Sequence, residues 1–184
     1  MSQQLARIEA LRVSAGAVLD WKWTPFADLS STDLYALLQL RSAVFVVEQN
    51  CVFQDLDGFD AQAMHLLGFA TESCAESPAE SASRSVDQSQ PPLLAYARCF
   101  CAGVKFAEAS IGRVLTAPNA RGTGLGHALM DRAIKALCAQ WGAQPIRIGA
   151  QAQLADFYAG HGFVDQGLPY IEDGIAHLEM LRTS

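Results

Sequence analysis

One stretch of the chain, from Ile111 to Trp141, joins a short apolar run, a glycine-rich turn and an amphipathic segment without interruption. The apolar run ends at Pro118, and the turn that follows carries glycines at positions 122, 124 and 126. Beyond the turn, apolar residues recur every fourth position from Leu125 to Trp141, which is the spacing of one buried helix face. The stretch therefore predicts a strand, a glycine loop and the start of a helix, as found in α/β folds.

A turn of this kind is a candidate anion site. The first amides of a helix have no intrahelical partner, and the helix dipole adds partial positive charge there. Glycines let a phosphate approach the backbone closely, and Arg121 can add a charge-assisted hydrogen bond. The pattern Arg-x-x-Gly-x-Gly, at Arg121, Gly124 and Gly126, lacks the Gly-Lys-Ser/Thr end of a P-loop. It also departs from a dinucleotide fingerprint, because His127 stands where the third glycine is due. A turn that only connects packed elements is the alternative.

Composition narrows the class of protein. The 184 residues are enough for one domain with a hydrophobic core, and 51% of them are hydrophobic. A net charge of −6 and a pI near 5.1 argue against a nucleic-acid surface or a polybasic membrane patch. No apolar run approaches the ~20 residues of a membrane span. The 5 cysteines show no zinc spacing, which predicts no metal site and a reducing, cytoplasmic setting.

The rest of the chain reads as alternating strands and helices in one domain at 21–184, preceded by an N-terminal extension at 1–20. Strands are predicted at 21–23, 61–70, 93–101, 111–117, 145–151, from 163 onward and at 175–181, with helices after Ser30, over 125–141 and over 152–160. Ser30 and Asp33 have the spacing of a capping box. The segment 71–92 is rich in serine, glutamate and proline, and we interpret it as a flexible insertion.

Charged residues outside the glycine loop offer a second pattern. Asp55, Asp57 and Asp60 lie in an acidic loop, but the residue due to be the last ligand of a calcium EF-hand is a leucine. We expect this loop to be solvated or to face a substrate. Arg98 and Arg113 fall on predicted strands, where we expect them to organise carboxylates within the sheet.

A second stretch with chemical potential runs from Gln151 to Phe163. A strand leads into a short helix whose late tyrosine, Tyr158, is followed by Gly162 and Phe163. A phenol with a pKa near ~10 keeps its proton at neutral pH and can donate it. The alternative is a half-buried tyrosine that packs the helix on the sheet.

Together, the two stretches resemble the GNAT N-acetyltransferase superfamily. The first matches its pyrophosphate loop, Arg/Gln-x-x-Gly-x-Gly/Ala. The second is similar to Asn-x-x-Ala-x-x-Phe/Leu-Tyr-x-x-x-Gly-Phe, with Gln151 in place of the asparagine and Leu154 in place of the alanine. Further segments resemble the ElaA branch of these proteins, and the likeness runs from about residue 23 to about residue 182, the insertion excepted. These segments are Leu40–Gln49, Asp55–Asp60, His65–Leu66, Tyr96–Arg98, Ile111–Val114, Ile148–Gln151 and Glu172–His177.

The resemblance implies a curved, mixed central sheet with splayed parallel strands and helices on both faces. Acetyl-CoA, as co-substrate, would lie between the strands at 111–117 and 146–150, and no metal is implied. The residues implied to bind it are Val114, Leu115 and Thr116 for the pantetheine arm, Arg121, Gly122, Thr123, Gly124, Leu125 and Gly126 for the pyrophosphate, and Gln151 and Tyr158.

The implied reaction is direct attack of a neutral amine on the thioester. A backbone N–H near Leu115 would polarise the carbonyl, and Tyr158 would protonate the leaving thiolate. Because no covalent enzyme intermediate is needed, no cysteine has to be catalytic.

The general base stays open at this stage. Glu108, Glu48, His65 and His177 are candidates, and a chain of waters is another. Each side chain has a structural alternative: a solvated loop residue for Glu108, a helix-end or salt-bridge partner for Glu48, and a hydrogen-bonded sheet residue for either histidine.

Two other functions stay open as well. The early Arg-x-x-Val-Phe-Val and Asp-x-x-Asp segments also resemble acyl-homoserine-lactone synthases, and a non-catalytic acyl-CoA-binding module would need the same loop. The expected partners are acetyl-CoA and a small-molecule or peptide amine, without nucleic acid or membrane, and the chain is expected to be a monomer or a homodimer.

Overall fold

The structure is a computed structural model that describes residues 18–71 and 91–183. Most of the predicted N-terminal extension and of the predicted insertion lies outside the described residues.

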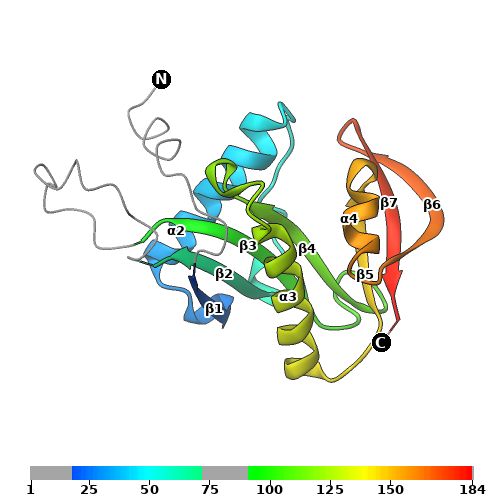
Figure 1. The fold of residues 1–184 in the computed structure, drawn as a ribbon, viewed down its shortest axis with the longest axis horizontal. Helices are drawn as coiled ribbons and strands as arrows, with labels where there is room; N and C mark the ends of the chain where they lie inside the picture. Colours follow the sequence, from blue (N-terminus) through cyan, green and yellow to red (C-terminus); the bar gives the residue numbers. More distant parts are fainter. Residues whose placement is uncertain (1–17, 72–90, 184) are drawn as a thin grey trace, which may run out of the picture.

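A 7-stranded mixed sheet forms the centre of the molecule, with the strand order β1-β2-β3-β4-β5-β7-β6 (Figure 1). Its strands are β1 (Leu19–Pro25), β2 (Met64–Ala70), β3 (Leu93–Phe100), β4 (Ala109–Thr116), β5 (Ile146–Gln151), β6 (Val164–Glu172) and β7 (Ile175–Arg182). β4 and β5 run parallel, whereas every other pair of neighbours is antiparallel. The predicted mixed α/β sheet is confirmed.

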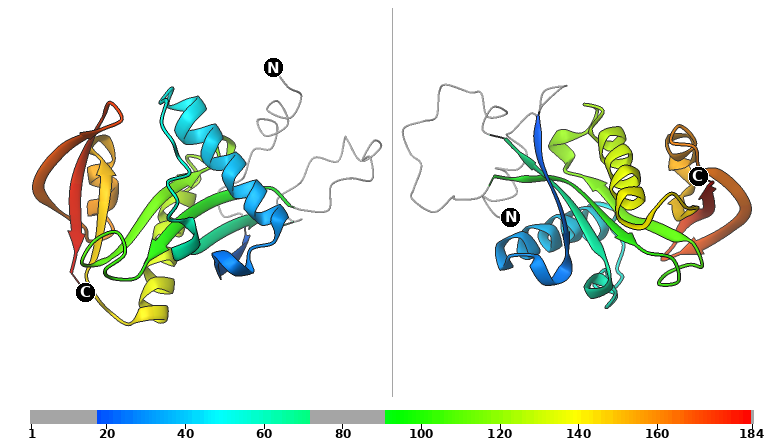
Figure 2. Two further views of the ribbon diagram at one scale, coloured as in Figure 1. Left: turned by 180° about the vertical axis from the view of Figure 1, so that it is seen from behind. Right: turned by 90° about the horizontal axis from the view of Figure 1, so that it is seen from below.

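Helices cover both faces of this sheet, as predicted. Figure 2 shows α2 (Ser31–Arg41) and the π-helical turn η2 (Ser42–Glu48) on one face, and α3 (Leu125–Trp141) and α4 (Ala155–Ala159) on the other. The predicted cap of α2 is present, because the Ser30 hydroxyl oxygen accepts the backbone N–H of Asp33 at 3.0 Å. A π-helical turn often marks a functional site, and η2 ends beside the glycine loop described below.

The hydrophobic core forms where the apolar faces of the strands and the helices pack together. Every residue of β3 is buried at the centre of the sheet, and α3 packs on β3 and β4. The predicted stripe of α3 is confirmed at Leu125, Leu129, Ala133 and Leu137, which are all buried. Each buried leucine contributes about 1.5–3 kcal/mol, so the stripe holds α3, and the loop that begins it, firmly on the sheet.

Most predicted strand ends differ from the observed ones by one or two residues, and the start of β2 differs by three. The strand expected to begin at residue 61 begins at Met64, because residues Asp60–Gln62 form a 3-10 turn, η3. The Asp60 carboxylate accepts hydrogen bonds from Arg41 at 2.7 Å and from Arg98 at 2.9 Å. These long-range bonds draw the chain inward and delay the start of the strand.

Candidate functional site

A V-shaped opening lies between β4 and β5. The two strands pair only at Ala109 with Ile146 and at Ser110 with Arg147. Beyond that point β4 stays paired with β3 and β5 with β7, so the edges that β4 and β5 turn towards each other carry backbone groups without a strand partner. Unpaired backbone N–H and C=O groups seek other partners, and an extended ligand can supply them.

A β-bulge in β4 lies inside this opening. On β3, Tyr96 pairs with Leu115 and Arg98 with Gly112, so two residues of β4 oppose one of β3. Arg113, the first of the two, has φ of 51°, which is unusual for a residue other than glycine. A left-handed conformation costs about 1–2 kcal/mol, and strain of this kind gathers at functional sites. The bulge bends β4 just where it leaves β5 and re-aims the peptide groups of Val114 and Leu115.

The glycine loop has the backbone geometry that the sequence predicted. Gly122 and Gly124 have φ of 75° and 84°, and Gly124 is the N-cap of α3. The first helical hydrogen bond runs from the N–H of Ala128 to the carbonyl of Gly124, which leaves the three preceding amides without a helical acceptor. The start of α3 therefore presents a row of free N–H groups, at the end of the strand that forms one side of the V.

Arg121 of this loop is held by Glu48 at the end of η2. The guanidinium donates to both carboxylate oxygens, at 2.8 and 2.9 Å, and both side chains are exposed. The salt-bridge alternative for Glu48 is therefore confirmed. An exposed ion pair contributes at most about 1 kcal/mol, so an anion at the helix start can compete with Glu48 for the arginine.

Tyr158 lies on α4 with its ring between Phe157 and Phe163, whose ring centroids are 5.0 and 6.1 Å away. Its side chain is nearly buried, and burial raises the pKa of the hydroxyl to about 12. Within 18–71 and 91–183, no residue forms a hydrogen bond with that hydroxyl. Tyr158 thus keeps its proton at neutral pH, and its hydroxyl donates that proton to no hydrogen-bond acceptor among the described residues.

His177 lies across the sheet from this tyrosine. It pairs directly with Gln151 at the end of β5, so both side chains share one face, and the Gln151 amide donates to Gln49 after η2 at 3.3 Å. The Nδ1 of His177 is 2.9 Å from the carbonyl oxygen of Ile175. A carbonyl only accepts, so Nδ1 carries the hydrogen, and in the neutral ring Nε2 keeps a free lone pair.

Tyr170 completes the surroundings of His177 and has no signal in the sequence. Its ring stacks on His177 with the centroids 5.4 Å apart. A methyl group at Gly149 would overlap the Tyr170 hydroxyl oxygen, so the glycine leaves room for this ring above β5.

The other two proposed bases are less well placed. Arg147 donates to both oxygens of Glu108, at 2.7 and 3.0 Å, and lowers the pKa of that carboxyl to about 2. Glu108 also directly precedes Ala109, at the closed end of the V. His65 is fully buried, and both of its ring nitrogens are bonded, to the Tyr96 hydroxyl at 2.7 Å and to the Asp60 carbonyl at 3.0 Å.

The carboxylates of the acidic loop are paired with arginines and not solvated, so the solvated interpretation is wrong for them, although Val52, Gln54 and Leu56 between them are exposed. Asp55 is 4% exposed, and its carboxylate binds Arg41 and Arg113 at 2.8 and 2.7 Å. Asp57 binds Arg98 through both of its oxygens, at 2.7 and 2.8 Å. The prediction that Arg98 and Arg113 organise carboxylates is confirmed. Because Asp55 also fixes Arg113, the loop supports the bulge that shapes the V.

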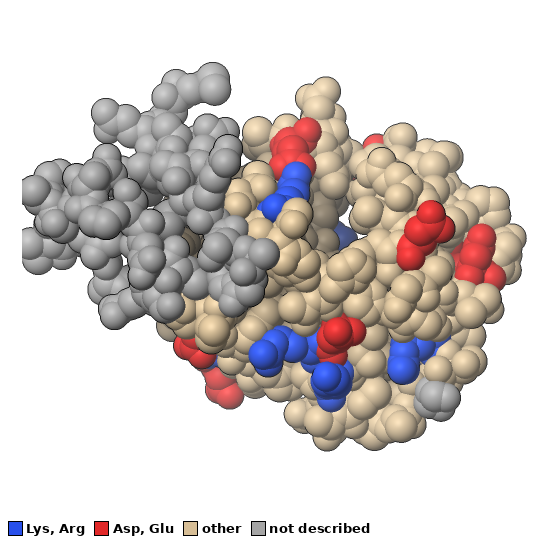
Figure 3. Space-filling view, in the orientation of Figure 1, with Lys and Arg blue, Asp and Glu red and all other residues tan. Residues whose placement is uncertain are grey.

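The molecular surface is hollowed where the V opens. Figure 3 shows a notch between the part that carries α3 and η2 and the part that carries α4, β6 and β7, with a basic side chain visible in its floor. The notch gives solvent access to the opening between β4 and β5.

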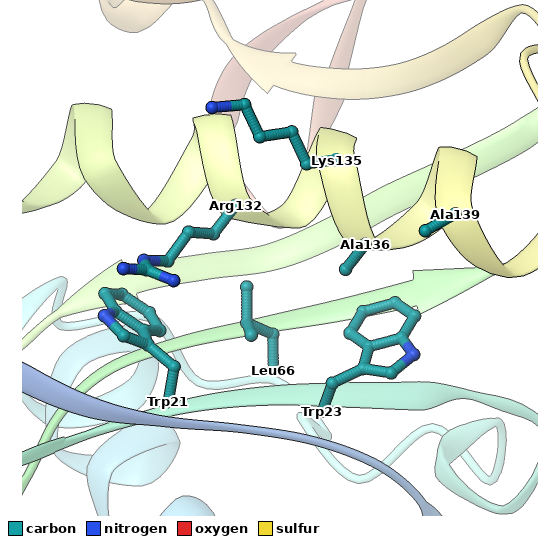
Figure 4. A pocket seen from close by; sticks show the side chains of 7 residues that line it. All are labelled: Trp21, Trp23, Leu66, Arg132, Lys135, Ala136 and Ala139. Carbon is teal, nitrogen blue, oxygen red and sulfur yellow. The ribbon is translucent and has the colours of Figure 1, made fainter.

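A separate shallow pocket of about 370 Å³ lies between β1 and the outer side of α3 (Figure 4). Its walls are Trp21, Trp23, Leu66, Arg132, Lys135, Ala136 and Ala139. None of the residues of the V or of the glycine loop lines it, so the pocket is distinct from the candidate site.

No set of three or more His, Cys, Asp and Glu side chains within 18–71 and 91–183 is arranged to hold a metal ion. Over the same ranges, no helix is long and apolar enough to cross a membrane.

Comparison with known proteins places this geometry in context. Residues 69–184 match the acetyltransferase (GNAT) domain family. Protein ElaA of Escherichia coli is 36% identical over 90% of this chain and 97% of its own, and its crystal structure matches with a TM-score of 0.74. The crystal structure of an acyl-CoA N-acyltransferase from Pseudomonas aeruginosa, 39% identical, matches with a TM-score of 0.76 and covers 90% of this chain and all of the other.

A CoA-dependent acyl-homoserine lactone synthase, determined with SAM and isopentyl-CoA, matches with a TM-score of 0.63. The match covers 90% of this chain and 82% of the synthase. At 15% identity this likeness concerns the fold alone.

Proposed function

Because the chain belongs to the GNAT acetyltransferase family, in its ElaA-like branch, we propose that it transfers an acetyl group from acetyl-CoA to an amine by direct attack. The observation that carries the proposal is the pairing of β4 with β5, which stops after two residue pairs. The resulting opening would extend from the glycine loop towards Tyr158 on one face of the sheet and His177 on the other.

The backbone supports the binding part of this proposal. The edge of β4 from Val114 to Thr116 has groups free to bond an amide-containing arm, and the first amides of α3 suit a diphosphate. Acetyl-CoA would supply the activated acetyl group as a thioester. Gln151 ends β5 and Tyr158 belongs to the helix that follows it, so both would lie along the same opening.

Two groups of this chain would then act on the acetyl thioester. The N–H near Leu115, in the segment re-aimed by the bulge, would stabilise negative charge on the carbonyl oxygen. The hydroxyl of Tyr158 would give its proton to the departing sulfur, which its high pKa keeps available at neutral pH. Because both groups belong to packed elements of the fold, they would need little reorganisation during the reaction.

His177 is the base that the geometry supports best among the candidates. Its Nδ1–H is bonded to a backbone carbonyl, so Nε2 is the nitrogen free to take a proton from the amine, directly or through water. The His177 side chain shares a face of the sheet with Gln151, which bonds to Gln49 after η2, whereas Tyr158 belongs to α4 on the other face, so proton removal and proton donation would occur on the two sides of the V. Glu48 would serve as a partner of Arg121, and Glu108 as a partner of Arg147.

A thiol-release assay with acetyl-CoA and a panel of primary and secondary amines tests the proposal, with calorimetric measurement of acetyl-CoA binding in parallel. Turnover above the rate of uncatalysed hydrolysis, with an acetylated product identified by mass spectrometry, is the expected result. Tight binding with no turnover on any amine would favour a non-catalytic acyl-CoA-binding module. Including SAM in the panel, with longer acyl-CoA donors, tests the acyl-homoserine-lactone-synthase alternative, and absence of any CoA binding would refute all three functions.

A further inference from the structure

Two histidines and an aspartate form a hydrogen-bonded chain beside the glycine loop. Nδ1 of His127, in the first turn of α3, is 3.0 Å from Nε2 of His161, in the turn after α4. Nδ1 of His161 is 3.0 Å from a carboxylate oxygen of Asp131, one helical turn along α3. The side chain of His161 is 6% exposed, whereas that of His127 faces solvent. We refer to these three residues as the His–His–Asp chain.

The carboxylate determines the direction of the protons along this chain. An ionised carboxylate only accepts, so Nδ1 of His161 carries a hydrogen, and in the neutral ring its Nε2 accepts one. His127 therefore donates through Nδ1, and its Nε2 is left with a lone pair that points away from the chain. No bond to that nitrogen is formed from elsewhere in 18–71 or 91–183. When Nε2 takes up a proton, the charge on His127 is compensated through His161 by Asp131.

The His–His–Asp chain spans the gap between the two helices on this face of the sheet. The ring of Phe157, on α4, has its centroid 4.8 Å from that of His127 and 5.2 Å from that of His161. It also lies 3.6 Å from where a methyl group on Gly126 would be. His127 thus stands on the turn whose amides precede the first helical bond of α3, and a packed ring holds that turn against α4.

We propose that His127 is a proton-linked phosphate-binding residue of the acyl-CoA site. It binds a phosphate group of CoA in its doubly protonated form, with the His161 ring and the Asp131 carboxylate supporting the charge from behind. This inference rests on the proposed function, which brings the diphosphate to the start of α3. Two further charged side chains lie close by in the described residues: Arg182 of β7, which donates to the backbone carbonyl of His161 at 3.2 Å, and Lys135, one helical turn beyond Asp131 on α3.

The consequence is that CoA binding takes up a proton. An imidazole changes charge between about pH 5 and 8, so the affinity for CoA should fall as the pH rises through this range. For one partly exposed contact between an imidazolium and a phosphate, the expected loss is roughly fivefold between pH 6 and pH 8.

Isothermal titration calorimetry at pH 6, 7 and 8, in two buffers of different ionisation enthalpy, measures both the dissociation constant and the number of protons taken up. 3′-Dephospho-CoA is the first probe, because its diphosphate does not titrate in this range, whereas a phosphomonoester such as that of CoA titrates near pH ~6. CoA is the second probe, and pantetheine, which has no phosphate, is the control ligand. If the affinities for both CoA and 3′-dephospho-CoA fall with rising pH, His127 contacts the diphosphate. If only the affinity for CoA falls, and falls more than it does in the variant His127→Gln described below, His127 contacts the 3′-phosphate.

The variant His127→Gln keeps a polar exposed side chain, so it should fold with an unchanged melting temperature. It should bind 3′-dephospho-CoA with the weak, pH-independent affinity that the wild type has at pH 8, and CoA more weakly than the wild type does at pH 6. Asp131→Asn should flatten the pH dependence in part. Lys135→Gln, which removes a charge two turns further along α3, should behave as the wild type. If the wild type binds CoA but His127→Gln matches it within twofold at every pH, the role of His127 is refuted and the proposed function stands. If the wild type binds no CoA, both are refuted.

Discussion

Replacing Tyr158 with phenylalanine separates the proposed acid from a merely structural tyrosine. The side chain is 7% exposed, and its ring packs against Phe157 and Phe163, contacts that phenylalanine preserves. The hydroxyl has no hydrogen-bond partner in the described parts of the chain, so its removal leaves no buried group unpaired. The free energy of unfolding should therefore change by less than about 0.5 kcal/mol, whereas Tyr158→Ala, which leaves a cavity, should cost about 3–5 kcal/mol.

The rate of acetyl transfer should respond quite differently. A positioned general acid contributes roughly 10²–10⁴-fold, which is about 2.7–5.4 kcal/mol at 1.36 kcal/mol per tenfold. Because burial raises the pKa of Tyr158 to about 12, the acid form is present at every pH below that value. Ionisation of this hydroxyl should therefore cause no loss of activity up to about pH 10, and a loss below that pH must come from another group.

Single-turnover acetyl transfer, followed by thiol release, is the appropriate assay because product release does not mask chemistry. Acetyl esters of aryl thiols, whose thiolates leave without protonation, should lose much less activity than acetyl-CoA in Tyr158→Phe. Wild-type single-turnover rates in this variant would refute the argument for an acid. A loss of several kcal/mol of stability would show instead that the hydroxyl bonds within the fold.

Three further predictions follow from the same geometry. Gly124→Val, at φ of 84°, should lower the free energy of unfolding by about 1–2 kcal/mol and abolish the stabilisation of about 2.7 kcal/mol that acetyl-CoA gives at ~100 times Kd. Gly126→Ala, whose methyl group would meet only an ordinary contact at 3.6 Å, should keep the stabilisation by acetyl-CoA. Equal thermal shifts with acetyl-CoA in the two variants would contradict the proposed phosphate loop. Asp60→Asn should lower the free energy of unfolding by about 3 kcal/mol near pH 7, because two buried arginines lose a carboxylate partner. Since these arginines lower the pKa of Asp60, the stabilisation by its carboxylate is present above about pH 4 and is lost as the pH falls below that value. In urea titrations the difference in stability between variant and wild type should therefore shrink towards pH 3, and a constant difference would argue against the ion pairs. His177→Gln should lower kcat/KM by ~10²–10⁴-fold with little change in acetyl-CoA affinity. A wild-type kcat/KM in this variant would mean that a chain of waters, and not His177, removes the proton from the amine.

The elements that could be predicted are those whose signal is local. The α3 stripe at every fourth residue and the glycines before it specify a helix, a left-handed N-cap and free amides within one short segment, and all of these are present. β3 was predictable for the same reason, as a short apolar run that only Arg98 interrupts. Periodicity and turn chemistry act between near neighbours, so a sequence states them directly.

The acidic loop shows where this reasoning ends. Asp55 looks like a solvated residue, since charged side chains rarely lie in a core unless they are paired. Its partners, Arg41 and Arg113, are 14 and 58 residues away, and only the order of the strands brings them together. The pairing of Arg98 and Arg113 with carboxylates was predictable as a type of contact, but the burial that follows from it was not.

The sequence by itself determined the α/β class, the glycine loop at Arg121–Gly126 that begins α3, and the tyrosine of α4. The tertiary structure alone decided how far β4 and β5 stay paired, that β4 bulges at Arg113, and that His177 lies beside Gln151. The physical reason is that local patterns specify the period and the turns of each segment. Strand order and register are set by burial summed over the whole chain, and they decide which distant side chains meet.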